Sequence, residues 1–278
     1  MEHVLTLECP ETPGIVAAVS TFLVEHGCDI IDNVQFGDRR ERHFFMRVHF
    51  EHPDDEGLRA GFASVASHFG MTWRLEPAAR RVRVLVMVSK FHHCLNDLLY
   101  RARHGDLPVE IVGVVSNHRD HEDQVQWYGI PFHHIPVTPD NKPQAERALL
   151  DLVEQLDVEL VVLARYMQVL SDSLCERMGG RIINIHHSFL PSFKGAKPYH
   201  QAHARGVKLV GATAHYVTAD LDEGPIIAQE VIEVDHRHDA EDLVSVGRDA
   251  EIAALRKAVR WHCEGRILLH GNRTVVLR

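Results

Sequence analysis

The stretch VRVLVMV at residues 82–88 decides the class of the fold, because six of its seven side chains are apolar. A strand of this kind meets apolar neighbours on both faces, which is typical of a parallel sheet covered by helices on both sides. Working outward, we predict further strands at 109–115, 130–135, 158–163 and 181–185, with helices at 95–104 and 144–156. The pattern predicts an α/β domain with a doubly wound, Rossmann-like sheet.

Residues 1–78 carry a different pattern. We predict strands at 3–9, 30–36, 43–50 and 71–75, and helices from residue 15 and at 56–69, where apolar side chains recur at helical spacing. The resulting order is βαββαβ, which is typical of a ferredoxin-like unit. The stretch EPAARR at 76–81 indicates a linker, so the predicted domains are 1–78 and 79–278.

The first turn of this unit, Pro13-Gly14-Ile15, resembles that of the ACT domain, an effector-binding module of amino-acid metabolism. Glycine lets a backbone approach a ligand closely, and a helix N-terminus suits a carboxylate. The resemblance implies an effector site at Gly14, with glycine or methionine as candidate effectors, and a homo-oligomer. A turn that only reverses the chain is the alternative that the residues leave open.

Composition narrows the class of protein. Of 278 residues, 30 are Lys or Arg and 39 are Asp or Glu, a net charge of −9, and no segment concentrates the basic side chains. We therefore expect no nucleic-acid partner. The five cysteines are odd in number and widely spaced, which argues against a disulfide framework and fits a reducing cytoplasm. No apolar run approaches the roughly 18 residues that span a bilayer, so we expect a soluble cytoplasmic protein without a membrane partner.

Polar side chains interrupt the strand that ends in Asn184-Ile185-His186-His187. Ligands of open α/β sheets bind beyond the carboxyl ends of the strands. Asn184 and His186 are two residues apart, so they share one face of the strand, where an amide and an imidazole can bind a carbonyl oxygen and move a proton. A second polar turn, Leu221-Asp222-Glu223-Gly224-Pro225, follows a strand predicted at 211–218. Each feature alone also has a purely structural explanation.

Together these pieces resemble the catalytic pattern of the folate-dependent formyltransferase family, namely Asn-x-His at 184–186, Ser188-Phe-Leu-Pro191, and Asp222 within Leu-Asp-x-Gly-Pro. The resemblance implies that Asn184 donates to the oxyanion on the formyl carbon. It implies that His186 exchanges a proton and that Asp222 orients His186 and helps to hold the nucleophile.

The same resemblance implies how the substrate is held. The segment RYMQVL at 165–170 matches the part of the family that encloses the pterin. Backbone groups would read the heterocycle, and Met167, Val169 and Leu170 would supply apolar walls. Gln168, within the same segment, is also expected to bind the substrate. His215 matches a polar position that lines the site, and we leave a structural role for it equally open.

Three stretches indicate a branch of the family. SKFHHC at 89–94 replaces the Gly/Ser-rich turn with which ribonucleotide transformylases hold a phosphate. The stretches at 186–202 and 272–275 resemble the hydrolytic branch, which passes the formyl group of 10-formyltetrahydrofolate to water. The implied products are formate and tetrahydrofolate, and the implied role is to supply formate and balance the one-carbon pool for purine biosynthesis. Tetrahydrofolate is then part of the substrate, and no separate cofactor or metal is implied.

Three alternatives stay open at this point. A formyltransferase with an amine acceptor is the nearest. Metal-dependent hydrolysis is suggested by the 22 histidines, and in particular by His92-His93-Cys94, His133-His134, His200-x-x-His203 and His236-x-His238. Neither His200-x-x-His203 nor His236-x-His238 has a recognisable third ligand in the sequence. A non-catalytic amino-acid sensor is the third alternative, and the complete set of Asn184, His186 and Asp222 argues against it.

Overall fold

The structure is a computed structural model that describes residues 1–53, 56–190 and 198–278. Its contacts divide the chain into two compact units. The first contains residues 1–80 together with 261–278, and the second contains residues 81–260. The predicted domain boundary lies two residues before this division, but residues 261–278, which we assigned to the second domain, group with the first unit.

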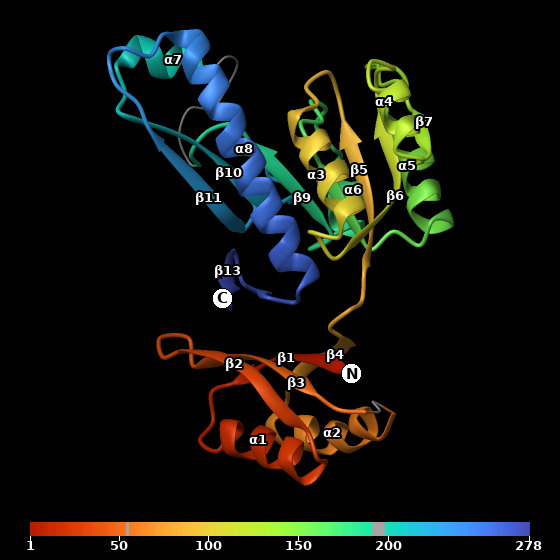
Figure 1. The fold of residues 1–278 in the computed structure, drawn as a ribbon, viewed down its shortest axis with the longest axis vertical. Coiled ribbons are helices and arrows are strands. Elements are labelled where there is room, and N and C mark those ends of the chain that lie inside the picture. Colours follow the sequence, from red (N-terminus) through yellow and green to blue (C-terminus); the bar gives the residue numbers. More distant parts are fainter. Residues whose placement is uncertain (54–55, 191–197) are drawn as a thin grey trace. The chain divides into compact units, whose positions relative to one another are not determined.

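The first unit is built on an antiparallel sheet with the strand order β2-β3-β1-β4. Its elements are β1 (Glu2–Pro10), α1 (Ile15–Glu25), β2 (Asp29–Asp38), β3 (His43–Glu51), α2 (Glu56–Phe69) and β4 (Thr72–Pro77) (Figure 1). This order confirms the predicted βαββαβ unit.

Both faces of this sheet are covered. Leu5 and Leu7 of β1 pack with Phe22 of α1 and Phe62 of α2 in one core. On the other face, Phe45 packs with the C-terminal hairpin, which consists of β12 (Ile267–His270) and β13 (Arg273–Val276). Burial on both faces explains why five successive residues of β3, from Phe44 to Val48, are buried without alternation. It is also the physical reason that residues 261–278 belong to this unit.

The second unit contains a seven-stranded sheet in the order β11-β10-β9-β8-β5-β6-β7 within its described residues. Its strands are β5 (Val82–Val88), β6 (Val109–Ser116), β7 (Phe132–His134), β8 (Leu160–Leu163), β9 (Ile182–His186), β10 (Leu209–Tyr216) and β11 (Ile226–Glu233). Strands β5 to β9 are parallel, which confirms the predicted sheet. Strands β10 and β11 continue it in antiparallel fashion, a direction that the apolar runs did not indicate.

The helices of this unit are α3 (His93–His104), α4 (Glu122–Trp127), α5 (Lys142–Gln155), α6 (Asp172–Arg177), α7 (Pro198–Arg205) and α8 (Ala240–Cys263), whose last residues enter the C-terminal segment. Met87, Val115 and Ile182 pack beneath α5 and α6, so one face of the sheet points to these two helices. Helices α3 and α8 lie on the viewer's side of the sheet in Figure 1.

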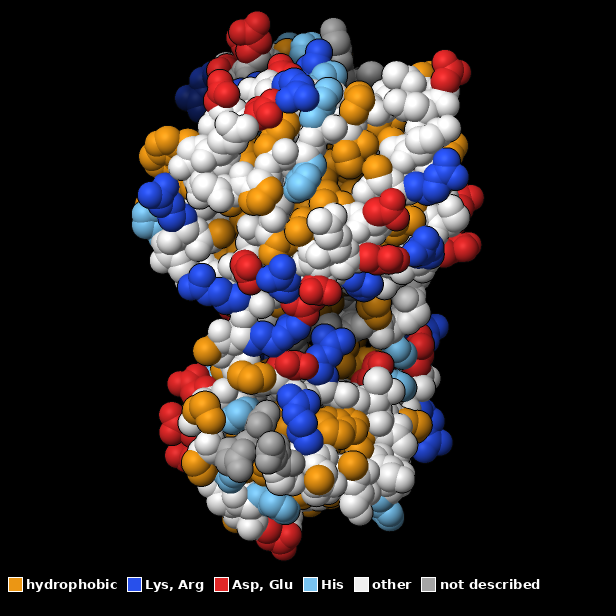
Figure 2. All heavy atoms as spheres, turned by 90° about the vertical axis from the view of Figure 1, so that its right-hand side faces the viewer, with side chains coloured by type: hydrophobic (Ala, Val, Ile, Leu, Met, Phe, Trp, Pro, Cys, Tyr) orange, Lys and Arg blue, Asp and Glu red, His pale blue; other side chains and the backbone are white. Residues whose placement is uncertain are grey.

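The surface carries mixed charge. On the face that Figure 2 shows, Lys and Arg side chains are scattered among Asp and Glu side chains and do not gather into one basic patch. None of the described helices has both the length and the apolar character needed to cross a membrane.

Candidate active site

Asn184 and His186 lie on β9, and the neighbouring strand brings a second histidine beside them. In the register of β9 and β10, His215 is opposite Asn184 and Thr213 is opposite His186. The Asn184 Nδ2 atom lies 3.2 Å from His215 Nε2. The antiparallel pairing therefore places His215 on the same face as the two residues predicted to be catalytic.

Asp222 enters this group from the loop between β10 and β11. Its Oδ2 atom lies 3.2 Å from His186 Nδ1, and its Oδ1 atom lies 3.6 Å from His215 Nε2. The hydrogen bond from His186, together with the neighbouring His215, holds the pKa of the Asp222 carboxyl well below its usual range. Asp222 is therefore an ionised carboxylate that accepts a hydrogen bond from His186 and lies next to His215.

The loop that carries Asp222 depends on its local backbone. Asp222 itself has φ 58°, in the left-handed region that aspartate tolerates better than most residues. A Cβ atom on Gly224 would lie 1.8 Å from the carbonyl oxygen of Tyr216. The Gly-Pro turn thus allows the backbone at Gly224 to approach the backbone of Tyr216 closely. This approach brings Asp222 back over β9 and β10.

The hydrogen bonds determine which imidazole nitrogens carry protons. The His215 Nδ1 atom lies 2.9 Å from the carbonyl oxygen of Tyr216, so Nδ1–H donates there and a neutral ring leaves Nε2 as an acceptor. In the same way, His186 Nδ1–H donates to ionised Asp222. Nε2 of His186 is then the position at which this ring gains and loses a proton.

Ser188 forms a hydrogen bond with Nε2 of His186, a contact that the sequence pattern did not predict. Its Oγ atom lies 2.8 Å from His186 Nε2, and the residue is 6% exposed. The Ser188 carbonyl accepts a hydrogen bond of 3.0 Å from Thr213 Oγ1, which in turn accepts one of 3.1 Å from Gln229 Nε2. The sequence contained a signal, because Ser188 follows His186 by two residues within the same motif. The part of that motif at 191–197 lies outside the described residues.

An apolar pocket lies beside the segment that follows β8. Gln168, Val169 and Leu170 line it, as do Met87, Val115, Ile135, Val137, Lys142, Ala145, Glu146, Leu149 and Tyr166. Met167 does not line this pocket. Its side chain is 53% exposed, and its backbone N–H donates to Ser89 Oγ at 3.0 Å.

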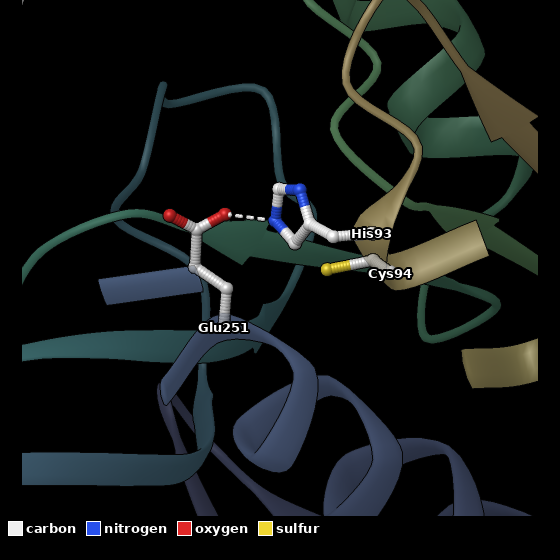
Figure 3. Close-up of side chains that lie close together, drawn as sticks. All are labelled: His93, Cys94 and Glu251. Carbon is white, nitrogen blue, oxygen red and sulfur yellow. Dashed lines mark hydrogen bonds and ion pairs between the residues drawn. The ribbon is translucent and has the colours of Figure 1, made fainter. Parts of the chain in front are cut away.

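A second group of polar side chains surrounds the buried carboxylate of Glu251 on α8. Its Oε2 atom lies 2.8 Å from His93 Nε2 and 3.3 Å from Arg165 Nε, and the Tyr199 hydroxyl donates to Oε1 at 3.0 Å. Figure 3 shows His93 and Glu251 reaching toward each other, with Cys94 beside them. We call His93, Arg165, Tyr199 and Glu251 the Glu251 network.

The ligand-type atoms of His93, Cys94 and Glu251 lie within 4.8 Å of one another, so the metal alternative can be tested here. Both oxygens of Glu251 already accept hydrogen bonds or an ion pair, and one partner is the Arg165 guanidinium, which would repel a cation. Burial raises the pKa of the Cys94 thiol well above its usual value, so the thiolate that a metal requires is disfavoured. These residues do not fit a metal site.

Among the described residues, one other group is close enough to hold a metal ion, namely Asp38, Glu41 and His270 in the first unit. Arg273 pairs with both of its carboxylates. The pairs His133-His134, His200-x-x-His203 and His236-x-His238 contribute to neither group.

Gly14 lies at the N-terminus of α1, where the sequence predicted it. Its φ of 96° belongs to the region that favours glycine, and a Cβ atom there would meet nothing within 4 Å. The backbone conformation thus accounts for this glycine, and the space next to it is open.

Comparisons with known proteins match the whole chain. A family model described as formyl transferase matches residues 82–259, and one described as ACT domain matches residues 3–60. A protein of Corynebacterium sp. (strain P-1) named formyltetrahydrofolate deformylase is 61% identical, with 100% of this chain and 99% of that protein covered. A crystal structure of the formyltetrahydrofolate deformylase from Burkholderia mallei is 51% identical with a TM-score of 0.95, covering 100% of this chain and 99% of that one.

A second group of solved structures matches less of the chain. The glycinamide ribonucleotide transformylase 1 from Symbiobacterium toebii is 31% identical with a TM-score of 0.66, covering 71% of this chain and 95% of that one.

Proposed function

Because the chain belongs to the formyltetrahydrofolate deformylases, we propose that Asn184, His186 and Asp222 are the residues with which it hydrolyses 10-formyltetrahydrofolate to formate and tetrahydrofolate. The observation that carries this assignment is the position of Asp222, which joins His186 and His215 next to the Asn184 amide. An oxyanion donor, a proton-transfer group and an ionised carboxylate are thereby brought to one point.

In this mechanism, a water molecule held by Asp222 and His186 attacks the formyl carbon. The Asn184 amide donates one N–H to His215 and has its second N–H for the developing oxyanion, a contact worth roughly 3 kcal/mol in other enzymes. The proton that the water loses passes to Nε2 of His186. When the bond between the formyl carbon and N10 breaks, the same proton is delivered to N10, and His186 returns to its neutral form.

Ser188 allows His186 to change its protonation state in this cycle. A serine hydroxyl can donate to the bare Nε2 or accept from Nε2–H. When it accepts, its own proton can turn to the carbonyl oxygen of Phe189, which lies 3.4 Å away. Ser188 is therefore a positioning residue that holds the ring through Nε2 before and after the transfer, and its hydroxyl turns to the Phe189 carbonyl while Nε2 exchanges a proton with water or N10.

The pterin ring of the substrate binds in the pocket lined by Gln168, Val169 and Leu170, on the side of β9 to which Asn184 and His186 point. Met167 contributes through its backbone rather than through its exposed side chain. His215 contacts Asn184 and Asp222, which supports a role in orienting these two residues. Tetrahydrofolate is part of the substrate, and the steps above require no metal and no separate cofactor.

The ACT domain is a module that usually binds amino acids. Its ligand here is glycine or methionine at the open turn of Gly14, and the domain assembles the chain into a homo-oligomer. Titrating each amino acid while measuring formate release and sedimentation tests both points. A ligand-independent rate with each amino acid would contradict the effector role, and a monomer at all concentrations would contradict the assembly.

The five cysteines are free, which fits action in the cytoplasm, where the enzyme supplies formate and balances the one-carbon pool for purine biosynthesis. The decisive experiment follows formate released from 10-formyltetrahydrofolate with no amine acceptor present. Stoichiometric formate and tetrahydrofolate are expected. A strict requirement for an amine would show that the chain is a transferase.

A further inference from the structure

The Glu251 network lies on the opposite face of β9 from the pocket at 166–170. Ile182 packs beneath α5 and α6, and Asn184 and His186 follow at intervals of two residues, so they share that face. His187 follows the end of the strand, and its ring lies 5.1 Å from the ring of His186 and 6.4 Å from the ring of Tyr199, which donates to Glu251. The end of β9 therefore separates a side that holds folate from a side occupied by the Glu251 network.

The network also lies where an open α/β sheet ordinarily binds a ligand. His93 is the first residue of α3, which follows β5, and Arg165 follows β8 closely. Strand β5 has β6 on one side and β8 on the other, so the direction of the connections changes between β5 and β8. The crevice beyond the carboxyl ends of two such strands is the general position for a second substrate.

Here the protein's own side chains fill that crevice. Exposed fractions are 15% for the side chain of His93, 10% for Arg165 and 2% for Glu251. The Arg165 guanidinium also stacks on the ring of Phe91, with 5.5 Å between its carbon and the ring centroid. Glu251 is thus desolvated and both of its oxygens are engaged, so a second substrate would have to displace a buried ion pair.

We propose that the His93–Glu251 pair determines specificity by closing the α3–α8 side of the formyl carbon to nucleophiles larger than water. The proposal rests on the function proposed above and explains why the formyl group goes to water rather than to an amine. In either reaction the nucleophile forms a bond to the formyl carbon, the bond to N10 breaks, and one proton of the nucleophile ends on N10. Only the size of the attacking molecule differs.

His93→Gly is the informative variant, because Glu251 keeps its contacts with Arg165 and Tyr199 and is not left as an isolated buried charge. The probe is glycinamide, a primary amine no larger than the imidazole ring, at about pH 8, where part of it is neutral. Formate and N-formylglycinamide are quantified together by mass spectrometry. We expect wild type to form formate alone, and His93→Gly to raise the ratio of formylated amine to formate by at least about tenfold.

Two further measurements keep the result interpretable. Cys94 lies beside His93 and is 1% exposed, so its alkylation rate by iodoacetamide should rise in His93→Gly if the crevice opens. His104→Ala, at the other end of α3 with a ring contact to Tyr100, is the matched control and should match wild type in both assays.

An unchanged product ratio in a folded His93→Gly that still releases formate would overturn the proposal. If His93→Gly does not fold, the products that wild type forms with glycinamide test the proposal. Efficient formyl transfer to glycinamide would overturn the proposal, whereas formate as the sole product would support it. Failure of wild type to release formate without an amine would instead contradict the proposed function.

Discussion

Asp222 Oδ2 lies 3.2 Å from His186 Nδ1, although one residue comes from the loop after β10 and the other from the end of β9. This contact fixes the tautomer of His186, because an ionised carboxylate accepts the Nδ1 proton and leaves Nε2 for proton transfer. Proton transfer by His186 therefore depends on a loop that is distant from it along the chain.

Asp222→Asn should lower kcat by about 10²- to 10⁴-fold, because the amide neither holds the water as strongly nor fixes the tautomer of His186. Affinity for tetrahydrofolate should change less than a few-fold, since Asp222 does not line the pocket at 166–170. Initial rates of formate release and fluorescence titration with tetrahydrofolate measure the two quantities. Turnover within a few-fold of wild type would contradict the assignment of Asp222.

Ser188→Ala should lower kcat by about fivefold while KM stays within a few-fold, because one neutral hydrogen bond contributes about 1 kcal/mol. Ser245→Ala, an exposed serine on α8, is the matched control. A kcat of Ser188→Ala equal to that of the control would mean that Ser188 does not act on His186, and a trapped formyl ester on Ser188 would identify it as a nucleophile instead.

Gly224→Ala should lower both stability and turnover. The added methyl group would lie 1.8 Å from the Tyr216 carbonyl, so the loop must move, at a cost of about 1–3 kcal/mol in the free energy of unfolding. The same movement displaces Asp222. Urea denaturation and formate release are measured beside Gly57→Ala, where an added Cβ meets nothing within 4 Å. A fully active Gly224→Ala would show that the loop has another conformation in solution.

His187 makes stability dependent on pH. Burial, followed by the nearby Arg165, lowers the pKa of His187 to about 4 in the folded protein. In the unfolded chain the ring is protonated from about pH 6.5 downward. The contribution of His187 to the free energy of unfolding is therefore fully present above that pH and is lost as the pH falls toward 4. Between pH 7.5 and pH 5, the free energy of unfolding of His187→Gln should therefore fall by about 2 kcal/mol less than that of wild type. Urea denaturation at the two pH values measures this difference, and equal losses would contradict it.

Much of the fold was predictable because burial on both faces of a strand is visible as a continuous apolar run. The runs at 82–88 and 109–115 indicated parallel strands, and the spacing of Asn184 and His186 placed both on one face. We assigned the C-terminal hairpin to the second domain, whereas its contacts are with Phe45, far away along the chain. A local sequence pattern does not indicate a contact with a residue so far away along the chain.

By itself, the sequence determined the two kinds of domain, the set of polar residues at the end of β9 and the resemblance that links them to formyl chemistry. Those properties depend on periodicity and on residue identity, which are local. Only the tertiary structure decided that Asp222 joins two histidines, that Ser188 holds the second nitrogen of His186 and that His93 reaches Glu251. These contacts depend on the antiparallel return of β10 and on the packing of α8, where distant segments meet through the burial of their apolar faces.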